Sequence, residues 1–106
     1  GLIMFHKCKA TVVQRGVNRD LADAYLKKPE NCSACTRVAD HQEFIISNPF
    51  EMPQGICPWA WADIRPFILT IASGGSLGMM KNRHTALATC SDLFRPVTFK
   101  IEKMDE

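Results

Sequence analysis

Apolar and polar residues alternate in several short stretches of the chain, and this alternation is typical of strands that bury one face. In residues 5–15, Cys8, Ala10 and Val12 are separated from one another by lysine and threonine side chains. Three further strands are predicted by short apolar or alternating runs, over residues 43–47, 85–90 and 96–103. The last of these runs alternates most clearly, and a turn over residues 91–95 separates it from the strand before it.

A first helix is predicted after a turn at residues 16–18. Asn18 suits the N-cap position, Asp20 favours the first helical turn, and Pro29 is expected to end the helix. A loop over residues 30–42 then leads to the second strand.

A second, longer helix is predicted from Pro58 to the glycine pair at residues 74–75. Proline fits the first helical position, because an N–H group there would have no partner inside the helix. Pro66 disfavours the helical conformation at Arg65, so we expect a kink or a break at that point. Apolar residues recur at helical spacing along one face, and these are Trp61, Ile64, Ile68 and Ile71.

The predicted order of elements is β-α-β-α-β-β. The 106 residues are enough for one domain, which we expect to cover residues 1–106. Strands and helices interleave, but the crossovers are few and the last two strands form a hairpin. We therefore predict an α+β fold, with a small antiparallel or mixed sheet and helices packed on one of its faces.

The composition excludes several classes of protein. Apolar residues make up 46% and charged residues 23% of the chain, which is ordinary for a globular domain. The net charge of +2 comes from scattered charges, so we expect no nucleic-acid partner. The longest uncharged stretch, residues 66–80, is shorter than the roughly 20 apolar residues of a membrane span. Residues 1–5 are too short for the apolar region of a secretion signal, so we expect a cytoplasmic protein.

The chain contains five cysteines, and this odd number excludes complete pairing in intramolecular disulfides. In the cytoplasm thiols stay reduced, and clustered cysteines more often bind a metal or react than form cross-links. Cys8 lies on the apolar side of the first predicted strand, and we expect it to belong to the core.

Cys57 directly precedes Pro58, so it falls at the N-cap of the second predicted helix. The unpaired N–H groups and the positive end of the helix dipole at such a position stabilise a thiolate. A thiolate there could attack an electrophile or bind a soft metal ion. The alternative interpretation, a small buried residue at a turn, stays open.

Three other cysteines lie in loops or at the end of a strand. Cys32 and Cys35 form one C-x-x-C pair in the loop over residues 30–42, and Cys90 ends the third strand. Three loops could bring Cys32, Cys57 and Cys90 together, with Cys35 or a histidine as a fourth ligand. Sulfur-rich tetrahedral ligation suits zinc or an iron–sulfur centre.

The segment after Cys57 contains two tryptophans and a carboxylate. Trp59 and Trp61 lie two residues apart and therefore on different faces of the helix, so one is expected in the core. The other could form the wall of a pocket or an interface. Asp63 lies in an otherwise apolar segment and needs a partner, and we favour a structural ion pair with Arg65 or Arg95 over a catalytic acid.

Two motifs cover much of the second half of the chain. The first reads M-P-x-G-x-C-x-W-A-W-A-D-I from Met52 to Ile64, and the second reads C-x-D-x-x-R-P-V-x-F from Cys90 to Phe99. With the Gly-Gly pair between them, they resemble a family of small prokaryotic proteins of uncharacterised function, over about residues 6–102. The family usually has a second cysteine where this chain has Thr89 and a glycine where it has Leu93.

The resemblance implies no particular activity. If the family uses both adjacent cysteines, this chain lacks one ligand or one half of a redox pair. The resemblance does imply that six residues belong to the part of the fold that the family shares, namely Cys32, Cys57, Cys90, Asp63, Asp92 and Arg95.

Three hypotheses about function follow from these residues. The first is a cytoplasmic protein that binds zinc or an iron–sulfur centre through Cys57, Cys90 and Cys32, with Cys35 as an optional fourth ligand. The second is an enzyme that uses Cys57 as its nucleophile and has an indole, that of Trp59 or Trp61, in the wall of its pocket.

The third hypothesis is a module for protein interaction or oligomerisation. In that case exposed aromatic side chains such as Trp59 and Phe67 would pack against a partner or a second copy of the chain.

Overall fold

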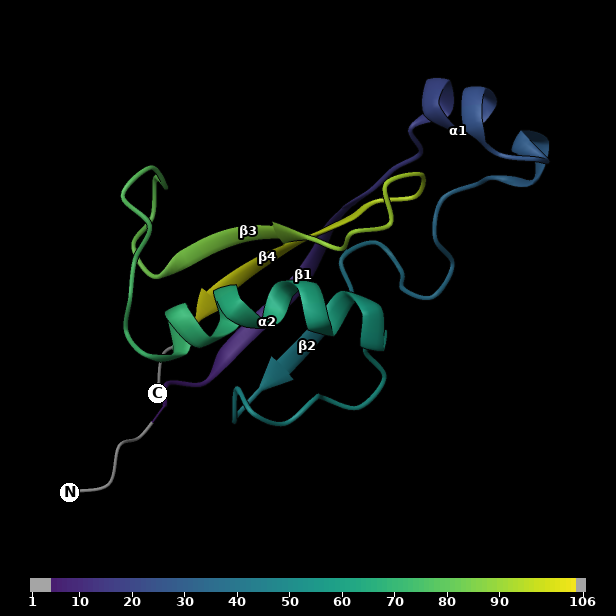
Figure 1. Cartoon of the computed structure of the whole chain (residues 1–106). Coiled ribbons are helices and arrows are strands. Elements are labelled where there is room, and N and C mark those ends of the chain that lie inside the picture. Colours follow the sequence, from purple (N-terminus) through teal and green to yellow (C-terminus); the bar gives the residue numbers. More distant parts are fainter. Residues whose placement is uncertain (1–4, 105–106) are drawn as a thin grey trace.

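In a computed structural model, which describes residues 5–104, four strands form one antiparallel sheet with a long helix across one face (Figure 1). The order of the strands across the sheet is β2-β1-β4-β3. Their bounds are Cys8–Arg15 for β1, Glu43–Ile46 for β2, Thr85–Thr89 for β3 and Val97–Lys103 for β4. The predicted α+β class is confirmed, and the sheet is antiparallel throughout.

Alternate residues of the two central strands form the core on the side of the sheet that faces the helix. In β1, Cys8, Ala10 and Val12 are fully buried, as the alternation predicts, so the core position of Cys8 is confirmed. Each lies opposite a residue of β4 in the pairing register, for example Ala10 opposite Ile101 and Val12 opposite Phe99. A bulge between Val12 and Gln14 shifts this register near the end of β1.

The long helix α2, Pro58–Ala72, packs one apolar face on β1, β3 and β4. Ala60, Ile64, Ile68 and Ile71 are its buried contacts, and each buried isoleucine contributes about 1.5–3 kcal/mol of transfer free energy. The break expected at Pro66 is absent, because the helix continues through it. Ile64 and Ile68 are buried on either side of Pro66, and their burial offsets the roughly 3 kcal/mol that an internal proline costs.

The glycine pair ends α2, as predicted. Gly74 has a positive φ of 89°, and its N–H donates to the carbonyl of Ile71. The N–H of Gly75 donates to the carbonyl of Thr70, which completes a Schellman motif. The N–H of His6 donates to the carbonyl of Ala72 and so joins the segment before β1 to this helix end.

The short helix α1, Arg19–Tyr25, and the 3₁₀ turn η1, Pro29–Asn31, extend away from the sheet (Figure 1). Among the helices and strands of residues 5–104, α1 contacts only η1, so the expectation that both helices pack on the sheet is wrong for α1. Pro29 does not end α1, which stops at Tyr25, but begins η1. We call residues 16–42, which leave β1 and return to β2, the arm.

Asn18 occupies the N-cap of α1 but does not cap it with its side chain. Its amide Nδ2 instead donates to the carbonyl of Leu93, in the turn between β3 and β4. The backbone N–H of Asn18 donates to the carbonyl of Phe94 in the same turn. Within residues 5–104 no helix is long and apolar enough to cross a membrane.

The end of α2 gives a test of the fold. A Cβ atom added at Gly75 would lie 2.9 Å from the backbone oxygen of Thr70, which cannot move without disturbing the helix end. We expect Gly75→Ala to lower the free energy of unfolding by about 1–3 kcal/mol, measured by chemical denaturation. Gly78→Ala is the matched control, because nothing lies within 4 Å of its added Cβ. Equal stability of the two variants would contradict this account of the helix end.

Candidate functional site

A cavity of about 460 Å³ lies where three segments meet: the loop after η1, the N-terminus of α2 and the β3–β4 turn. Three cysteines line it, one from each segment, and these are Cys35, Cys57 and Cys90. Trp59, Asp92 and Arg95 also line this cavity, together with apolar residues of the core such as Val97 and Phe99. We call it the thiol pocket.

Cys57 occupies the N-cap of α2, as predicted, with extended backbone dihedrals (φ −64°, ψ 126°). Pro58 follows it at the first helical position, and the carbonyl of Cys57 accepts a hydrogen bond from the N–H of Trp61. The side chain makes no capping hydrogen bond and is half-buried against the core. The residue therefore lies at the positive end of the helix dipole, and it lines the pocket.

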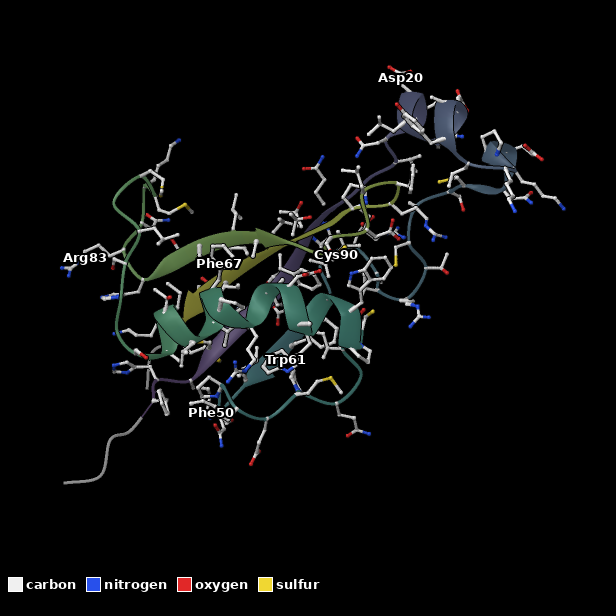
Figure 2. All side chains as sticks on the ribbon, viewed as in Figure 1. Asp20, Phe50, Trp61, Phe67, Arg83 and Cys90 are labelled. Atoms are coloured by element: carbon white, nitrogen blue, oxygen red, sulfur yellow. The ribbon has the colours of Figure 1, made fainter. Side chains whose placement is uncertain are left out.

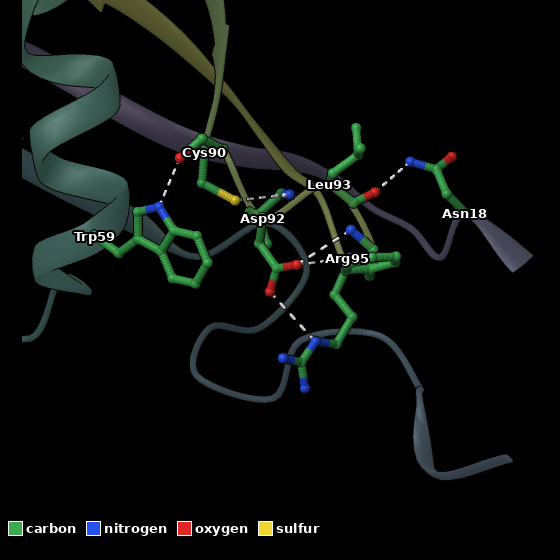
Figure 3. Close-up of polar contacts among 9 residues, drawn as sticks. Asn18, Trp59, Cys90, Asp92, Leu93 and Arg95 are labelled. Carbon is green, nitrogen blue, oxygen red and sulfur yellow. Dashed lines mark hydrogen bonds and ion pairs between the residues drawn. The ribbon is translucent and has the colours of Figure 1, made fainter. Parts of the chain in front are cut away.

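Cys90 is held more tightly, just beyond the end of β3, and only 9% of it is exposed. Its N–H donates to the carbonyl of Val97, and the N–H of Val97 donates to the Cys90 sulfur at 3.4 Å (Figure 3). These two bonds close the β3–β4 turn. They fix the position of the Cys90 sulfur, and Cys90 lines the pocket.

The β3–β4 turn is fastened to the first turns of α2 through Ser91. The indole Nε1 of Trp59 donates to the hydroxyl oxygen of Ser91 at 2.6 Å (Figure 3), and the N–H of Ser91 donates to a carboxylate oxygen of Asp63 at 2.6 Å. The ion pair expected between Asp63 and an arginine is therefore not formed. A backbone N–H provides the partner instead, and the guanidinium of Arg65 donates to the carbonyl of Pro49.

Asp92 and Arg95 form an ion pair within the turn, with 3.3 Å between Oδ2 and Nε (Figure 3). The other oxygen of Asp92 accepts from the N–H groups of Phe94 and Arg95, both at 3.2 Å. This pattern is an Asx turn, which fixes the conformation of residues 92–95. Asp92 thus has a structural role, and it neutralises part of the charge that Arg95 brings to the pocket.

The wall formed by the arm is held by Arg15. Its Nη1 donates to the carbonyl of Cys35 at 2.7 Å, and its Nε pairs with Asp40 at 2.8 Å. The hydrogen bond from Arg15, together with its charge, lowers the pKa of the Asp40 carboxyl, and the same bond raises the pKa of Arg15. The pair is therefore intact at neutral pH, and its contribution is lost as the pH falls through the lowered pKa of Asp40.

Arg37 is the second arginine of the thiol pocket, and it was not singled out from the sequence. Its side chain is exposed on the pocket wall and makes no hydrogen bond or ion pair with another residue of the range 5–104. The lining therefore carries two arginines against one carboxylate, that of Asp92.

Cys32 lies apart from the other three candidate ligands. It is buried, and it lines a second, smaller cavity of about 230 Å³ beside η1 and Phe94. Arg19 fixes it there by donating from Nη2 to the Cys32 carbonyl and from Nη1 to the carbonyl of Pro29. The structure therefore places Cys35, rather than Cys32, in one pocket with Cys57 and Cys90, and Arg95 lines both cavities.

None of the five cysteines forms a disulfide. Over residues 5–104, no group of three or more histidine, cysteine, aspartate or glutamate side chains is arranged to hold a metal ion. The predicted ligand set of Cys32, Cys57 and Cys90 is not assembled in this arrangement of the chain.

The two tryptophans of α2 differ as their spacing predicts. Trp61 is half-buried and packs against the core, whereas Trp59 is 53% exposed and forms part of the pocket wall. Figure 2 shows that Phe67 and Trp61 lie at different positions along α2. Phe67 is 37% exposed, and its role in an interface remains a prediction.

Sequence reasoning missed Ser91, Arg15 and Arg37, which brace or line the thiol pocket. Arg37 could have been noticed from its place two residues after the C-x-x-C pair. Ser91 contacts Asp63, 28 residues away, and Trp59, 32 residues away, and Arg15 contacts Cys35, 20 residues away. No local sequence pattern reveals contacts over such separations.

Comparison with known proteins identifies no relative: no family model, no curated protein and no solved structure matches the chain.

The contact between α2 and the β3–β4 turn can be tested through Asp63. Replacing Asp63 by alanine removes the acceptor of the Ser91 N–H group, and we expect a loss of about 1–2 kcal/mol in the free energy of unfolding. The fluorescence of Trp59, which is bonded to Ser91, should shift in the same variant. Glu51→Ala removes an exposed carboxylate from a loop and is the control. An Asp63→Ala variant as stable as Glu51→Ala would show that this contact contributes little.

Proposed function

We propose that the protein is a thiol-dependent enzyme in which Cys57 is the nucleophile and the thiol pocket receives the substrate. One observation carries this proposal: Cys57 lies at the N-cap of the 15-residue helix α2 and on the wall of a 460 Å³ cavity. A cavity of this volume is within the usual range for small-molecule sites.

The environment of Cys57 suits a nucleophile. Only the thiolate of a cysteine attacks an electrophile, and the N-terminus of a helix stabilises a negative charge through its dipole and unpaired N–H groups. The Cys57 side chain does not form a hydrogen bond that caps the helix. Its sulfur is therefore available to a substrate in the pocket, where it would form a covalent bond with an electrophilic atom.

The other lining groups suit the binding of a small substrate. Trp59 offers an apolar surface whose orientation is fixed by the hydrogen bond to Ser91. Arg37 has no partner in the described part of the chain, so it can pair with a negative group on a ligand. Arg95 is already engaged by Asp92 and adds a weaker positive potential.

The positions of the motif residues support a relationship to the small prokaryotic family that they resemble. Cys57, Trp59, Cys90, Asp92 and Arg95 all line the thiol pocket. Asp63, from the same motifs, braces the turn that carries Cys90. We propose that the chain is related to that family and shares this pocket with it, in a cytoplasmic protein whose thiols are kept reduced.

The nucleophile can be identified by its rate of alkylation. With a small, neutral reagent such as iodoacetamide at neutral pH, we expect Cys57 to be alkylated about tenfold faster than any other cysteine. Mass spectrometry of peptides at successive times measures each rate. The fast phase should vanish in Cys57→Ser and persist in Cys35→Ser, a matched control because Cys35 is also half-buried on the pocket wall.

Uniformly slow labelling of all five cysteines would overturn the assignment of Cys57 as nucleophile. Loss of the fast phase in Cys35→Ser, with retention in Cys57→Ser, would transfer the role to Cys35.

Soft-metal binding is a second candidate function, because three cysteines from three separate segments line one pocket. Thiolates of Cys35, Cys57 and Cys90 would have to move closer together to bind zinc or an iron–sulfur centre, both of which favour sulfur ligands. Cys32 was predicted from the sequence as one of the ligands, but it lines the second cavity. It could bind the same metal only after a movement of the arm.

Metal binding can be measured on protein purified without oxygen. The candidate predicts about one equivalent of zinc or iron by elemental analysis, and a loss of most of it in Cys57→Ser or Cys90→Ser. Cys8→Ser is the control, because Cys8 lies in the core outside the pocket. Protein that carries almost no transition metal, with all its thiols titratable, would exclude this function.

A further inference from the structure

We propose that Cys57 and Cys90 act as a dithiol pair that exchanges with small disulfides carrying negative charge. This inference rests on the proposed function, and it adds a second reacting residue and a class of substrate. Cys57 would attack the substrate, and Cys90 would resolve the intermediate.

The contacts of the β3–β4 turn place Cys90 beside the start of α2. Ser91, the residue after Cys90, bonds to Trp59, which is two residues after Cys57. The N–H of Ser91 bonds to Asp63 in the next turn of the same helix. Two short bonds therefore hold the Cys90 end of the turn against the helix end that carries Cys57, and both cysteines line the same cavity.

The two cysteines differ in access in the way that a dithiol mechanism requires. Cys57 is half-buried on the pocket wall, so a small disulfide can reach it from the cavity. Cys90 is only 9% exposed, so it is poorly placed to meet a substrate from solution. The N–H of Val97 points at the Cys90 sulfur and would stabilise it as a thiolate when it attacks.

The exchange consists of two displacements with balanced electrons. In the first, the Cys57 thiolate attacks one sulfur of the substrate R–S–S–R, forming Cys57–S–S–R and releasing R–S⁻, which takes a proton from water. In the second, Cys90 loses its proton to water and attacks the Cys57 sulfur, forming Cys57–S–S–Cys90 and releasing the second R–S⁻. The protein loses two electrons, and the substrate disulfide gains them.

The charge on the pocket wall selects the class of disulfide. Arg37 is exposed on this wall without a partner among residues 5–104, and Arg95 adds to it despite its pairing with Asp92. Ser33 and Thr36, from the same loop as Arg37, also line the pocket, and their hydroxyl groups can donate hydrogen bonds to a carboxylate. A substrate with carboxylates on its substituents therefore fits better than a cationic one.

The pair can be detected by treating the reduced protein with dithiodipropionate, an anionic disulfide. We expect the product to lack two hydrogens and to contain a Cys57–Cys90 bond, identified by mass spectrometry of the digested protein. Cys90→Ser, whose hydroxyl can still accept from Val97, should stop at the mixed disulfide on Cys57. Cys32→Ser is the control, because Cys32 lines the second cavity and not the thiol pocket, and it should form the same internal disulfide as the unchanged protein.

The results separate this inference from the proposed function. If Cys57 is alkylated rapidly by iodoacetamide but only a stable mixed disulfide accumulates in the unchanged protein, the dithiol pair is overturned and the nucleophile stands. An internal disulfide between Cys35 and Cys57 would also overturn the role of Cys90. If Cys57 reacts with neither reagent, both proposals fail.

The substrate class is tested by comparison with cystamine, a cationic disulfide of similar size. We expect dithiodipropionate to react with Cys57 about tenfold faster than cystamine, and Arg37→Ala to reduce this preference by about threefold. Arg83→Ala is the matched control, because Arg83 is exposed in the loop before β3, far from Cys90 in Figure 2. Equal rates for the two disulfides, or an equal effect of the two substitutions, would overturn the selection by charge.

Discussion

The burial of one face of α2 on the sheet is the constraint on which the site depends. Ile64, Ile68 and Ile71 are fully buried, so the helix has one orientation and one position along the strands. Its N-terminus then lies beside the β3–β4 turn, and Cys57 lies where the turn brings Cys90. A hydrophobic contact without any chemistry of its own thus determines which thiols share a cavity.

The features that depend on neighbouring residues could be predicted from the sequence. These are the strands, the N-cap at Cys57 and the end of α2 at the glycine pair. They could be predicted because alternation, a proline at the first helical position and a Gly-Gly pair act through neighbouring residues. The continuation of α2 through Pro66 could not be predicted from the sequence, because the burial of the helix on the sheet outweighs the local tendency of proline to break a helix.

The membership of the candidate site could be predicted only in part. Cys57 and Cys90 lie at the ends of regular elements, as expected, and Cys35, the optional fourth ligand, lines the pocket with them, whereas Cys32 lines the second cavity. The path of the loop decides between these two, and it is set by hydrogen bonds from arginines of β1 and α1 to backbone carbonyls of the arm. A backbone carbonyl is present at every residue, so no sequence pattern reveals which one an arginine selects.

The two walls of the thiol pocket differ in stability, because one of them belongs to the arm. One wall belongs to the sheet and α2, whose side chains form the apolar core. The other belongs to the arm, which adds Val38 and part of Cys35 to the core but is otherwise held by polar contacts, such as those of Arg15 and Asn18, and whose helix α1 packs on no strand. Segments with few buried apolar contacts unfold locally, at a lower free-energy cost than the unfolding of the whole domain. The pocket can therefore exchange its contents while the sheet stays folded, and hydrogen exchange of the arm, not the melting temperature, reports how often it does so.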